Sequence, residues 1–408
     1  MGNIIVGQSG GPTAVINSSL AGVYSAAVEN GAGKVYGMQN GIKGLLEGRY
    51  VDLSLHIKDK LDIEVLRRTP SSFLGSCRYK LPAHRENEEV YVKIFEMLKK
   101  LDIAYFFYIG GNDSMDTIMK LSKYAADINS PIRFIGVPKT IDNDLAVTDH
   151  SPGFGSAAKY IGTTMKEIVR DGTVYGTNQI NIVEIMGRHA GWLTGAAALA
   201  TGEDCEGADL IFMPEIPFSF EDFYERINTL QNRGRKSLVI AVSEGIKLGD
   251  GTFVCDYSAQ GEKAVDAFGH VSLGGTAQIL AGLVGERFKS KTRAIELSIL
   301  QRAAAHIASR TDNEEAFTAG EKAVRGALEG KTGMTVIFER VSDNPYTIKT
   351  ELVPVELIAN VEKKVPAEWI NVADASVSKE MVDYMRPLIH GELSQIMVGG
   401  LPRHLILK

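Results

Sequence analysis

Ala104-Tyr-Phe-Phe-Tyr-Ile109 leads directly into Gly110-Gly-Asn-Asp-Ser114, and Ile132-Arg-Phe-Ile-Gly-Val137 leads in the same way into Pro138-Lys-Thr-Ile-Asp-Asn-Asp144. Each apolar run is typical of a strand buried in a parallel sheet. In open α/β sheets, ligands bind beyond the carboxyl ends of the strands, where both polar motifs are expected. A glycine turn that opens a helix suits phosphate oxygens. The second motif adds two carboxylates and a lysine, so the pair indicates phosphoryl transfer.

Strand and helix patterns alternate along the first 300 residues. Further strands are predicted at Asn3–Val6, Val35–Met38, Gln179–Ile185, Asp209–Phe212, Ser237–Val242 and Ala294–Leu300. Helices are predicted at Pro12–Glu29, Glu88–Lys100, 112–126, 155–170, Ala190–Ala200, Phe220–Asn232 and Val271–Phe288. Such alternation predicts an α/β fold with parallel sheets and right-handed crossovers.

The pattern weakens after about residue 302. Helices are predicted there at Asn313–Leu328 and Lys379–Leu388, and extended segments at Thr335–Glu339 and Thr347–Val355. Because 408 residues exceed one typical domain, two lobes or one large α/β unit are expected.

Composition excludes several classes of protein. The chain is 44% hydrophobic and 23% charged, and it has no apolar run long enough to span a membrane. A net charge of −6 without a long basic block argues against a nucleic-acid partner. The three cysteines are scattered, which argues against a disulfide framework or structural zinc. With no signal peptide at the N-terminus, these features predict a cytoplasmic protein.

Two glycine motifs could bind phosphate. Gly7-Gln-Ser-Gly-Gly-Pro-Thr13 follows a strand and offers backbone amides, although a plain strand–helix turn explains it equally well. It is neither a P-loop nor a dinucleotide-binding motif. In Gly110–Ser114, Asn112 and Asp113 stand at a helix start. A helix cap needs only one such residue, so the cluster favours a functional role.

Asp142 and Asp144 form a candidate acid–base pair. Carboxylates two residues apart in an extended segment point to the same side. One could take a proton from an attacking hydroxyl while the other orients a ligand or helps to hold Mg²⁺. The alternative is a solvated, Asx-rich turn. The adjacent Lys139 and the buried strand favour function.

Polar residues also follow the predicted strands of the second half. Met186-Gly-Arg188 follows one strand and Ser243-Glu-Gly245 another, and Arg293 and Arg302 bracket the strand predicted at Ala294–Leu300. Each arginine alone could be a surface charge. Together, four arginines at element ends suit a doubly phosphorylated sugar: Arg78, Arg188, Arg293 and Arg302.

These motifs, in this order, resemble the phosphofructokinases, and specifically the pyrophosphate-dependent 6-phosphofructokinases. The matching stretches are Gln8–Thr13, Leu74–Arg78, Gly110–Ser114, Pro138–Asp144, Val183–Arg188, Ser243–Gly245 and Arg293 with Arg302. The resemblance covers about the first 300 residues. It implies two Rossmann-like, three-layer lobes with mainly parallel sheets: 1–152 for the phosphoryl donor, 153–301 for the sugar phosphate, and 302–408 packing back on both.

By that resemblance, the reaction is reversible phosphoryl transfer from Mg²⁺-pyrophosphate to the 1-hydroxyl of fructose 6-phosphate, in glycolysis and gluconeogenesis. Asp142 matches the base, and Lys139 and Arg188 match groups that stabilise charge. The substrate side is matched by Thr140, Asp144, Met186, Gly187, Glu244, Arg293 and Arg302. The donor side is matched by Gly11, Arg78, Gly110 and Asp113.

The resemblance also implies how the donor is chosen. ATP-dependent relatives usually have glycine in place of Asp113 and often in place of Lys139. A carboxylate at position 113 would repel the α-phosphate of a nucleotide, whereas pyrophosphate ends before reaching it. Asn112 and Asp113 are the candidate Mg²⁺ ligands, but Asn112 replaces the usual aspartate, which leaves the metal's carboxylate ligand open.

Further departures affect the acceptor pocket. Gln179 stands where many relatives have a phosphate-binding arginine, and Ile299 replaces a common histidine. These changes leave room for another sugar phosphate, such as sedoheptulose 7-phosphate. In the family the arginine pair acts partly across a subunit interface, which implies a homodimer or homotetramer. The rivals are an ATP-dependent enzyme, a non-catalytic regulatory subunit and, without a dinucleotide motif to support it, a nucleotide-binding oxidoreductase.

Overall fold

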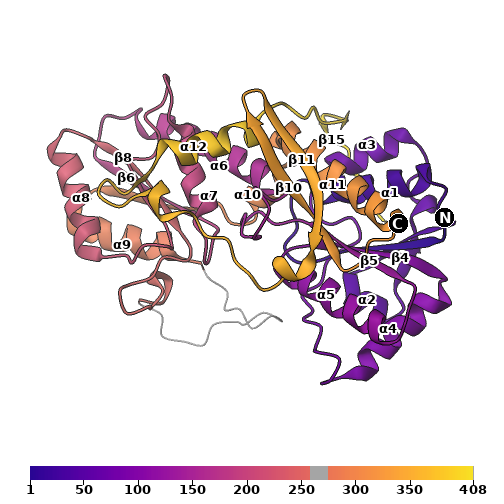
Figure 1. Cartoon of the computed structure of the whole chain (residues 1–408). Coiled ribbons are helices and arrows are strands. Elements are labelled where there is room, and N and C mark those ends of the chain that lie inside the picture. The colour runs from indigo at the N-terminus through magenta and orange to yellow at the C-terminus, as the bar shows by residue number, and fades with distance from the viewer. Residues whose placement is uncertain (258–273, 408) are drawn as a thin grey trace.

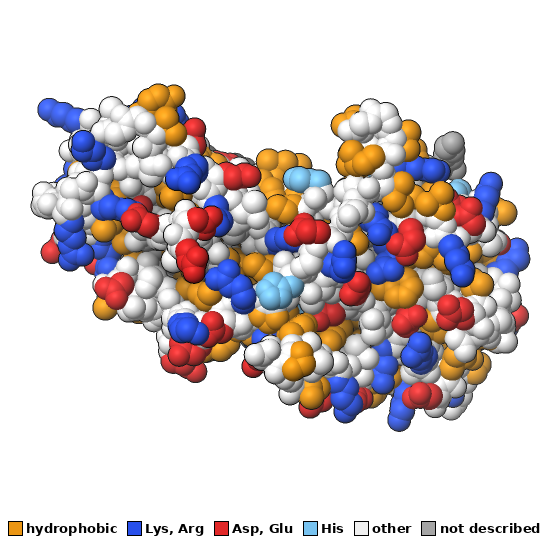
Figure 2. All heavy atoms as spheres, turned by 90° about the horizontal axis from the view of Figure 1, so that it is seen from above, with side chains coloured by type: hydrophobic (Ala, Val, Ile, Leu, Met, Phe, Trp, Pro, Cys, Tyr) orange, Lys and Arg blue, Asp and Glu red, His pale blue; other side chains and the backbone are white. Residues whose placement is uncertain are grey.

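Two β-sheets organise the chain, one toward each end of an elongated molecule (Figure 1). The computed structural model describes residues 1–257 and 274–407. On the face seen in Figure 2, acidic and basic side chains are interspersed. Among the helices of the described residues, none combines the length and the apolar character that crossing a membrane requires.

The first sheet has seven strands in the order β11-β10-β5-β4-β1-β2-β3. Its strands are β1 (Asn3–Gln8), β2 (Val35–Met38), β3 (Tyr50–Asp52), β4 (Ile103–Gly110), β5 (Arg133–Pro138), β10 (Met334–Asp343) and β11 (Tyr346–Pro354). The five inner strands run parallel, and the edge strands β3 and β11 pair antiparallel. The carboxyl ends of β1, β4 and β5 therefore meet at one edge of the sheet.

Helices cover both faces of this sheet because successive side chains of a strand point to opposite faces. Ile4 and Val6 face a core shared with α1 (Ile16–Glu29) and α11 (Arg310–Leu328). Ile5 faces the other core, beneath α2 (Gly41–Leu46), α4 (Glu88–Lys100) and α5 (Asn112–Asp127). The short α3 (Lys60–Arg68) packs against α1.

Two glycines let α1 and α11 pack backbone to backbone. A Cβ atom on Gly22 would lie 2.0 Å from the Phe317 carbonyl oxygen, and one on Gly320 would lie 2.2 Å from the Ser19 carbonyl oxygen. No side chain fits at such distances. The C-terminal third is thereby fixed against the first helix of the chain.

The second sheet has four parallel strands in the order β7-β8-β6-β9. They are β6 (Gln179–Ile185), β7 (Leu210–Phe212), β8 (Ser237–Ser243) and β9 (Lys291–Glu296). One face packs on α6 (Phe154–Gly172), α7 (Trp192–Gly195) and α12 (Lys379–Met385). The other packs on α8 (Phe220–Asn232) and α9 (Thr276–Phe288). The predicted arrangement of two three-layer units with mainly parallel sheets is confirmed.

The C-terminal third contributes to both units. β10 pairs with β5 of the first sheet, while Met381 and Met385 of α12 lie in the core of the second. The remaining short elements are α10 (Leu300–Ala303), β12 (Ile370–Asn371), β13 (Ser376–Val377), β14 (Met397–Val398) and β15 (Leu401–Pro402). The division at residues 152 and 301 stays a prediction.

Several predicted elements have different bounds. The first helix begins at Ile16 rather than Pro12. The turn before it is held by the Thr13 hydroxyl oxygen, which accepts hydrogen bonds from the backbone N–H groups of Val15 (3.2 Å) and Ile16 (2.9 Å). The helix predicted at Ala190–Ala200 is a short α-helix followed by a 3₁₀ turn.

At the C-terminus, α12 ends at Met385 and continues as a 3₁₀ turn containing Pro387, which has no N–H to extend the helix. The start of the helix predicted at Val271–Phe288 lies partly outside the described residues, and α9 begins at Thr276.

The strand predicted at Ala294–Leu300 is wrong in position. β9 runs from Lys291 to Glu296, since its register is set by pairing with β6: Arg293 lies opposite Asn181, and Glu296 opposite Glu184. Arg293 is therefore inside the strand rather than just before it.

Candidate active site

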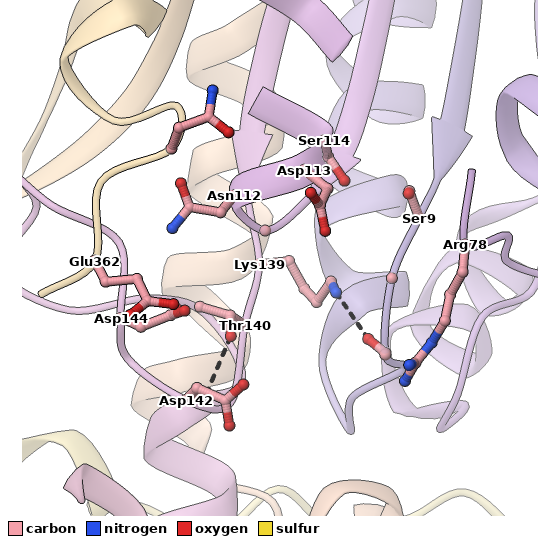
Figure 3. Close-up of a pocket in the computed structure, with 14 residues that line it drawn as sticks. Ser9, Arg78, Asn112, Asp113, Ser114, Lys139, Thr140, Asp142, Asp144 and Glu362 are labelled. Carbon is pink, nitrogen blue, oxygen red and sulfur yellow. Dashed lines mark hydrogen bonds between the residues drawn. The ribbon is translucent and has the colours of Figure 1, made fainter. Parts of the chain in front are cut away.

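A cavity of about 560 Å³ lies at the carboxyl ends of β1, β4 and β5, where the sequence motifs predicted a ligand (Figure 3). It is lined by Ser9, Gly10, Gly11, Arg78, Gly111, Asn112, Asp113, Ser114, Lys139, Thr140, Asp142, Asp144, Asn360 and Glu362. The structure thus brings most of the donor-side residues to one place. Gly110 ends β4 behind the lining, and a Cβ atom there would lie 1.9 Å from Ser114 Oγ.

Lys139 is the central cation of this cavity. Its side chain is only 3% exposed, and Nζ donates a 2.7 Å hydrogen bond to the Gly11 carbonyl oxygen. Burial lowers the pKa of Lys139 to about 8, and attraction to Asp142 and Asp144 partly offsets that effect. The ammonium is therefore largely protonated at pH 7 and only partly hydrated, which suits contact with an anionic ligand.

Arg302 and Arg78 add positive charge beside Lys139. A Cβ atom on Gly11 would lie 3.3 Å from Arg302 Nη1, so this arginine reaches the glycine turn from α10. The positive charges of both guanidinium groups lower the pKa of Lys139. Burial, followed by Arg78, lowers the pKa of Arg302 itself. Three cations around one polar cavity form a site for several anionic oxygens.

The Asp142–Asp144 segment is bent rather than extended as predicted, although both residues line the same cavity. Asn143 between the two carboxylates adopts a left-handed conformation with φ 54°. The Thr140 hydroxyl accepts a 3.1 Å hydrogen bond from the Asp142 backbone N–H and closes the bend. Figure 3 shows the consequence: the Asp144 carboxylate lies toward Glu362, and the Asp142 carboxylate points elsewhere.

Both carboxyl groups have raised pKa values. Burial raises the pKa of Asp142 to about 6, with repulsion from Glu244 as the next cause and Lys139 and Arg302 opposing it. Burial and then repulsion from Asp142 raise the pKa of Asp144 to about 7. Asp142 is therefore a stronger base than a solvated carboxylate, yet it still ionises near neutral pH.

Oxygen atoms without hydrogen-bond donors mark the other wall of the cavity. Asn112 donates from Nδ2 to the Val361 carbonyl oxygen (2.9 Å), which leaves its Oδ1 as an acceptor. Within the described chain, Asn112 Oδ1 and Asp144 Oδ1 are buried and accept no hydrogen bond. Asn360 and Glu362 complete this wall. Sequence reasoning missed both, because they lie in the last hundred residues, which carry no motif.

These oxygens fit a hard divalent cation. No cluster of three or more metal-ligating His, Cys, Asp or Glu side chains exists among the residues that the structure describes. Mg²⁺ does not need one, because it keeps several waters and commonly binds one or two carboxylates together with substrate phosphates. Asn112, Asp113, Asp144 and Glu362 supply the candidate oxygens.

The second sheet presents its own strand ends to the Asp142 side. Glu244 follows β8, and its Oε1 accepts a 3.3 Å hydrogen bond from the Gly187 N–H. Burial raises the pKa of Glu244, and Arg188 is among the groups that oppose the rise. The Met186 N–H donates to Gln301 Oε1 (3.2 Å), which ties this loop to α10 and so to Arg302. Met186, Gly187, Arg188, Glu244 and Arg302 therefore form one group.

Arg293 does not join that group within one chain. Its Nη1 donates to Gln179 Oε1 at 3.2 Å, and the side chain lines a separate cavity of about 270 Å³ between β9 and α6. The register of β9 fixes this placement, because Arg293 lies opposite Asn181, well before the carboxyl end of β6.

Comparison with known proteins agrees with this geometry. Residues 3–326 match the family model described as phosphofructokinase. The pyrophosphate--fructose 6-phosphate 1-phosphotransferase of Methylococcus capsulatus is 40% identical over 410 residues, which cover 99% of this chain and 96% of the relative. The protein of the same name from Halomonas elongata is 40% identical over 406 residues, which cover 98% and 95%.

A solved structure has the same architecture. The pyrophosphate-dependent phosphofructokinase from Marinobacter aquaeolei superposes with a TM-score of 0.88 at 38% identity, covering 100% of this chain and 96% of that one. The α/β fold with two mainly parallel sheets is therefore shared over the whole length, including the last hundred residues. With its motifs at these strand ends and these full-length relatives, the chain belongs to the phosphofructokinase family.

Proposed function

We propose that this protein is a pyrophosphate-dependent 6-phosphofructokinase. It transfers a phosphoryl group from Mg²⁺-pyrophosphate to the 1-hydroxyl of fructose 6-phosphate and yields fructose 1,6-bisphosphate and phosphate. The observation that carries the proposal is that Asp113, Lys139 and Asp142 line one cavity. The phosphoanhydride bond that breaks and the phosphate ester bond that forms are close in free energy, so the reaction can run in both directions. The enzyme therefore serves both glycolysis and gluconeogenesis. We expect it to act in the cytoplasm.

Asp142 acts as the base. A carboxylate whose pKa is about 6 is mostly ionised at pH 7 and can accept the proton of the 1-hydroxyl as that oxygen attacks the phosphorus. Lys139 and Arg188 stabilise the charge that develops on the transferred group and on the departing phosphate. In phosphoryl transfer the protein contributes mainly through positioning and electrostatics, so fixed cations and a fixed base are the main requirements.

Asn112, Asp113, Asp144 and Glu362 are the residues that would hold Mg²⁺ with the donor. Bound Mg²⁺ supplies neutralisation of negative charge on the phosphate oxygens. Asp113 stands at the start of α5 and lines the cavity that holds Lys139, which we call the donor wall. Its negative charge opposes any phosphate that extends beyond the pyrophosphate, which disfavours ATP. Gly11 and Arg78 contact the donor from the opposite side.

The acceptor is held by the group on the second sheet. Glu244 accepts hydrogen bonds from sugar hydroxyls, Thr140 and the Met186–Gly187 backbone contact the sugar phosphate, and Arg302 binds the 6-phosphate. Arg293 lines a different cavity from Asp142 of its own chain, so we expect it to complete the 6-phosphate site of a second copy. The active form is then at least a homodimer, and a homotetramer satisfies the same requirement.

The proposal is tested by incubating the purified chain with pyrophosphate, Mg²⁺ and fructose 6-phosphate and following the phosphorus signals by NMR. We expect stoichiometric fructose 1,6-bisphosphate and phosphate, and pyrophosphate formation when the products are supplied instead. A parallel sample with sedoheptulose 7-phosphate tests the alternative acceptor. The absence of turnover with every donor and acceptor would contradict the proposal and favour a regulatory subunit.

A further inference from the structure

We propose that Tyr384, on α12 in the C-terminal third, is a positioning residue for the Asp142–Asp144 turn and acts through the side chain of Asn143. The inference rests on the proposed function, because the turn carries the proposed base. It assigns to the motif-poor end of the chain a part in placing that base.

Asn143 is fully buried, and both ends of its amide are used. Nδ2 donates a 2.8 Å hydrogen bond to Tyr384 Oη, and Oδ1 accepts a 3.0 Å hydrogen bond from the Ser151 N–H. Its backbone is left-handed, a conformation that asparagine tolerates better than most residues other than glycine. The two amide hydrogen bonds anchor this bend between Asp142 and Asp144 to its surroundings.

Tyr384 is itself held on several sides. Its hydroxyl donates a 2.7 Å hydrogen bond to the Asp149 carbonyl oxygen. Its ring centroid lies 5.4 Å from those of both Trp192 and Trp369, and the Arg340 guanidinium carbon lies 4.7 Å from it. A phenol enclosed in this way offers a fixed acceptor to Asn143 rather than a mobile one.

A second contact holds the far end of the same turn. The Lys363 N–H donates a 2.7 Å hydrogen bond to the Asp144 carbonyl oxygen. The Lys363 carbonyl oxygen accepts from Trp192 Nε1 (3.1 Å), the same tryptophan that packs on Tyr384. Both anchors of the turn thus converge on one aromatic cluster.

This arrangement relates the base to the acceptor side of the site. The turn follows β5 of the first sheet, whereas Trp192 and α12 belong to the core of the second, which also carries Glu244. Tyr384 therefore fixes Asp142 relative to the sheet that binds the sugar. An error of about 1 Å in such placement costs on the order of 100-fold in rate, so a single hydroxyl can matter here.

The test is Tyr384→Phe, which keeps the ring packing and removes the acceptor for Asn143. We expect kcat to fall about 10- to 100-fold while the KM values for pyrophosphate and fructose 6-phosphate stay within about threefold. Tyr346→Phe is the matched control: its hydroxyl bonds Glu315 Oε1 (2.7 Å) and its ring also faces Arg340 (5.3 Å), but it does not contact the turn. We expect Tyr346→Phe and Tyr384→Phe to lower the urea midpoint of unfolding by similar amounts, and Tyr346→Phe to keep the wild-type kcat.

Asn143→Gly completes the test, because glycine adopts the left-handed backbone without strain and lacks the amide. If Tyr384 acts through Asn143, the double variant should be no slower than the slower single variant. Wild-type kcat in Tyr384→Phe, equal loss of kcat in Tyr346→Phe, or fully multiplicative losses in the double variant would overturn the proposal. A wild-type protein without turnover would instead refute the proposed function, so the two failures are distinguishable.

Discussion

The donor cavity around Lys139 and the group of acceptor residues on the second sheet differ in one respect. A single chain supplies the lining of the donor cavity, whereas Arg293 stands apart from the acceptor residues of its own chain. The donor cavity is lined by residues of a single chain, and Lys139 in it is only 3% exposed. On the acceptor side, Arg293 lies on β9, an edge strand whose residues are all at least partly exposed, and it lines a different cavity. In the proposed function, the residues that bind pyrophosphate therefore all come from one chain, whereas the sugar-phosphate site takes Arg293 from a second copy.

The difference has a physical consequence for charge. On the donor side, burial moves the pKa values of Lys139 and Asp142 toward neutrality, to about 8 and about 6. Charges in such a site are screened little by salt, and those on an exposed edge strand are screened strongly. Substitutions on the donor wall should therefore change kcat, and substitutions on the acceptor side should change mainly the KM for fructose 6-phosphate.

The largest expected effect is that of Asp142→Ser. Loss of the base should lower kcat by about 10³- to 10⁴-fold with modest KM changes, measured by steady-state kinetics with each substrate varied. Asp209→Asn is a matched control, since the pKa of this buried carboxyl is also raised to about 6 but it pairs with Arg235 on the second sheet. Near-wild-type turnover of Asp142→Ser would remove Asp142 as the base.

The next largest effect is expected for Lys139→Met. Removing a buried cation from the donor cavity should lower kcat by about 100- to 1,000-fold, because the departing phosphate loses its neighbouring charge. Lys159→Met, which removes another buried lysine whose Nζ bonds the Gly391 carbonyl oxygen (2.8 Å), should keep its activity. A Lys139→Met enzyme changed only in its KM for pyrophosphate would show that the lysine binds the donor without assisting transfer.

Arginine substitutions compare the two halves directly. Arg302→Gln and Arg293→Gln should each raise the KM for fructose 6-phosphate about 10- to 100-fold, as expected for a lost charged hydrogen bond. Only Arg293→Gln should leave the KM for pyrophosphate nearly unchanged, because Arg302 also lies beside Gly11 of the donor cavity. An unchanged KM in Arg293→Gln would mean that the acceptor side is complete without a second copy.

Subunit mixing gives the decisive control for Arg293. In a hybrid of Asp142→Ser and Arg293→Gln chains, one site combines an intact Asp142 with an intact Arg293 from the other chain. Activity should therefore appear after subunit exchange, although each parent is impaired. If Asp142 and Arg293 of the same chain form one site, mixing the two variants restores no activity.

The smallest expected effect is the pH dependence. The activity needs ionised Asp142 and protonated Lys139, so kcat/KM should fall below pH 6 and above pH 8, about 10-fold at pH 5. Lys139→Arg keeps the positive charge at high pH and should move only the alkaline limb upward. An unchanged alkaline limb would assign that ionisation to a substrate or to another group.

The meeting of two motifs in one cavity could be predicted from the sequence because the signals are local. Gly110–Ser114 and Pro138–Asp144 each follow an apolar strand, and parallel strands place such motifs together. The left-handed bend at Asn143 could not be predicted, since it is held by Tyr384, 241 residues away in the sequence. Glu362 was missed for the same reason: it reaches the cavity through a bridge to Leu145 and belongs to no motif.

The placement of Arg293 shows a different limit. A run of β-forming residues indicates that a strand exists, but its pairing partner sets where the strand begins and ends. A shift of a few residues moved Arg293 from the expected strand boundary to the interior of β9. Whether such a residue serves its own chain or a second copy depends on that register, which only the assembled sheet defines.

The central claim, that the donor wall selects pyrophosphate, is tested most directly by comparing kcat/KM for pyrophosphate and for ATP with fructose 6-phosphate saturating. Repulsion by Asp113 of a third phosphate group should cost several kcal/mol, so pyrophosphate should be favoured by about 100- to 1,000-fold, and Asp113→Gly should narrow the ratio. An equal or higher kcat/KM with ATP in the unmodified protein would contradict the account.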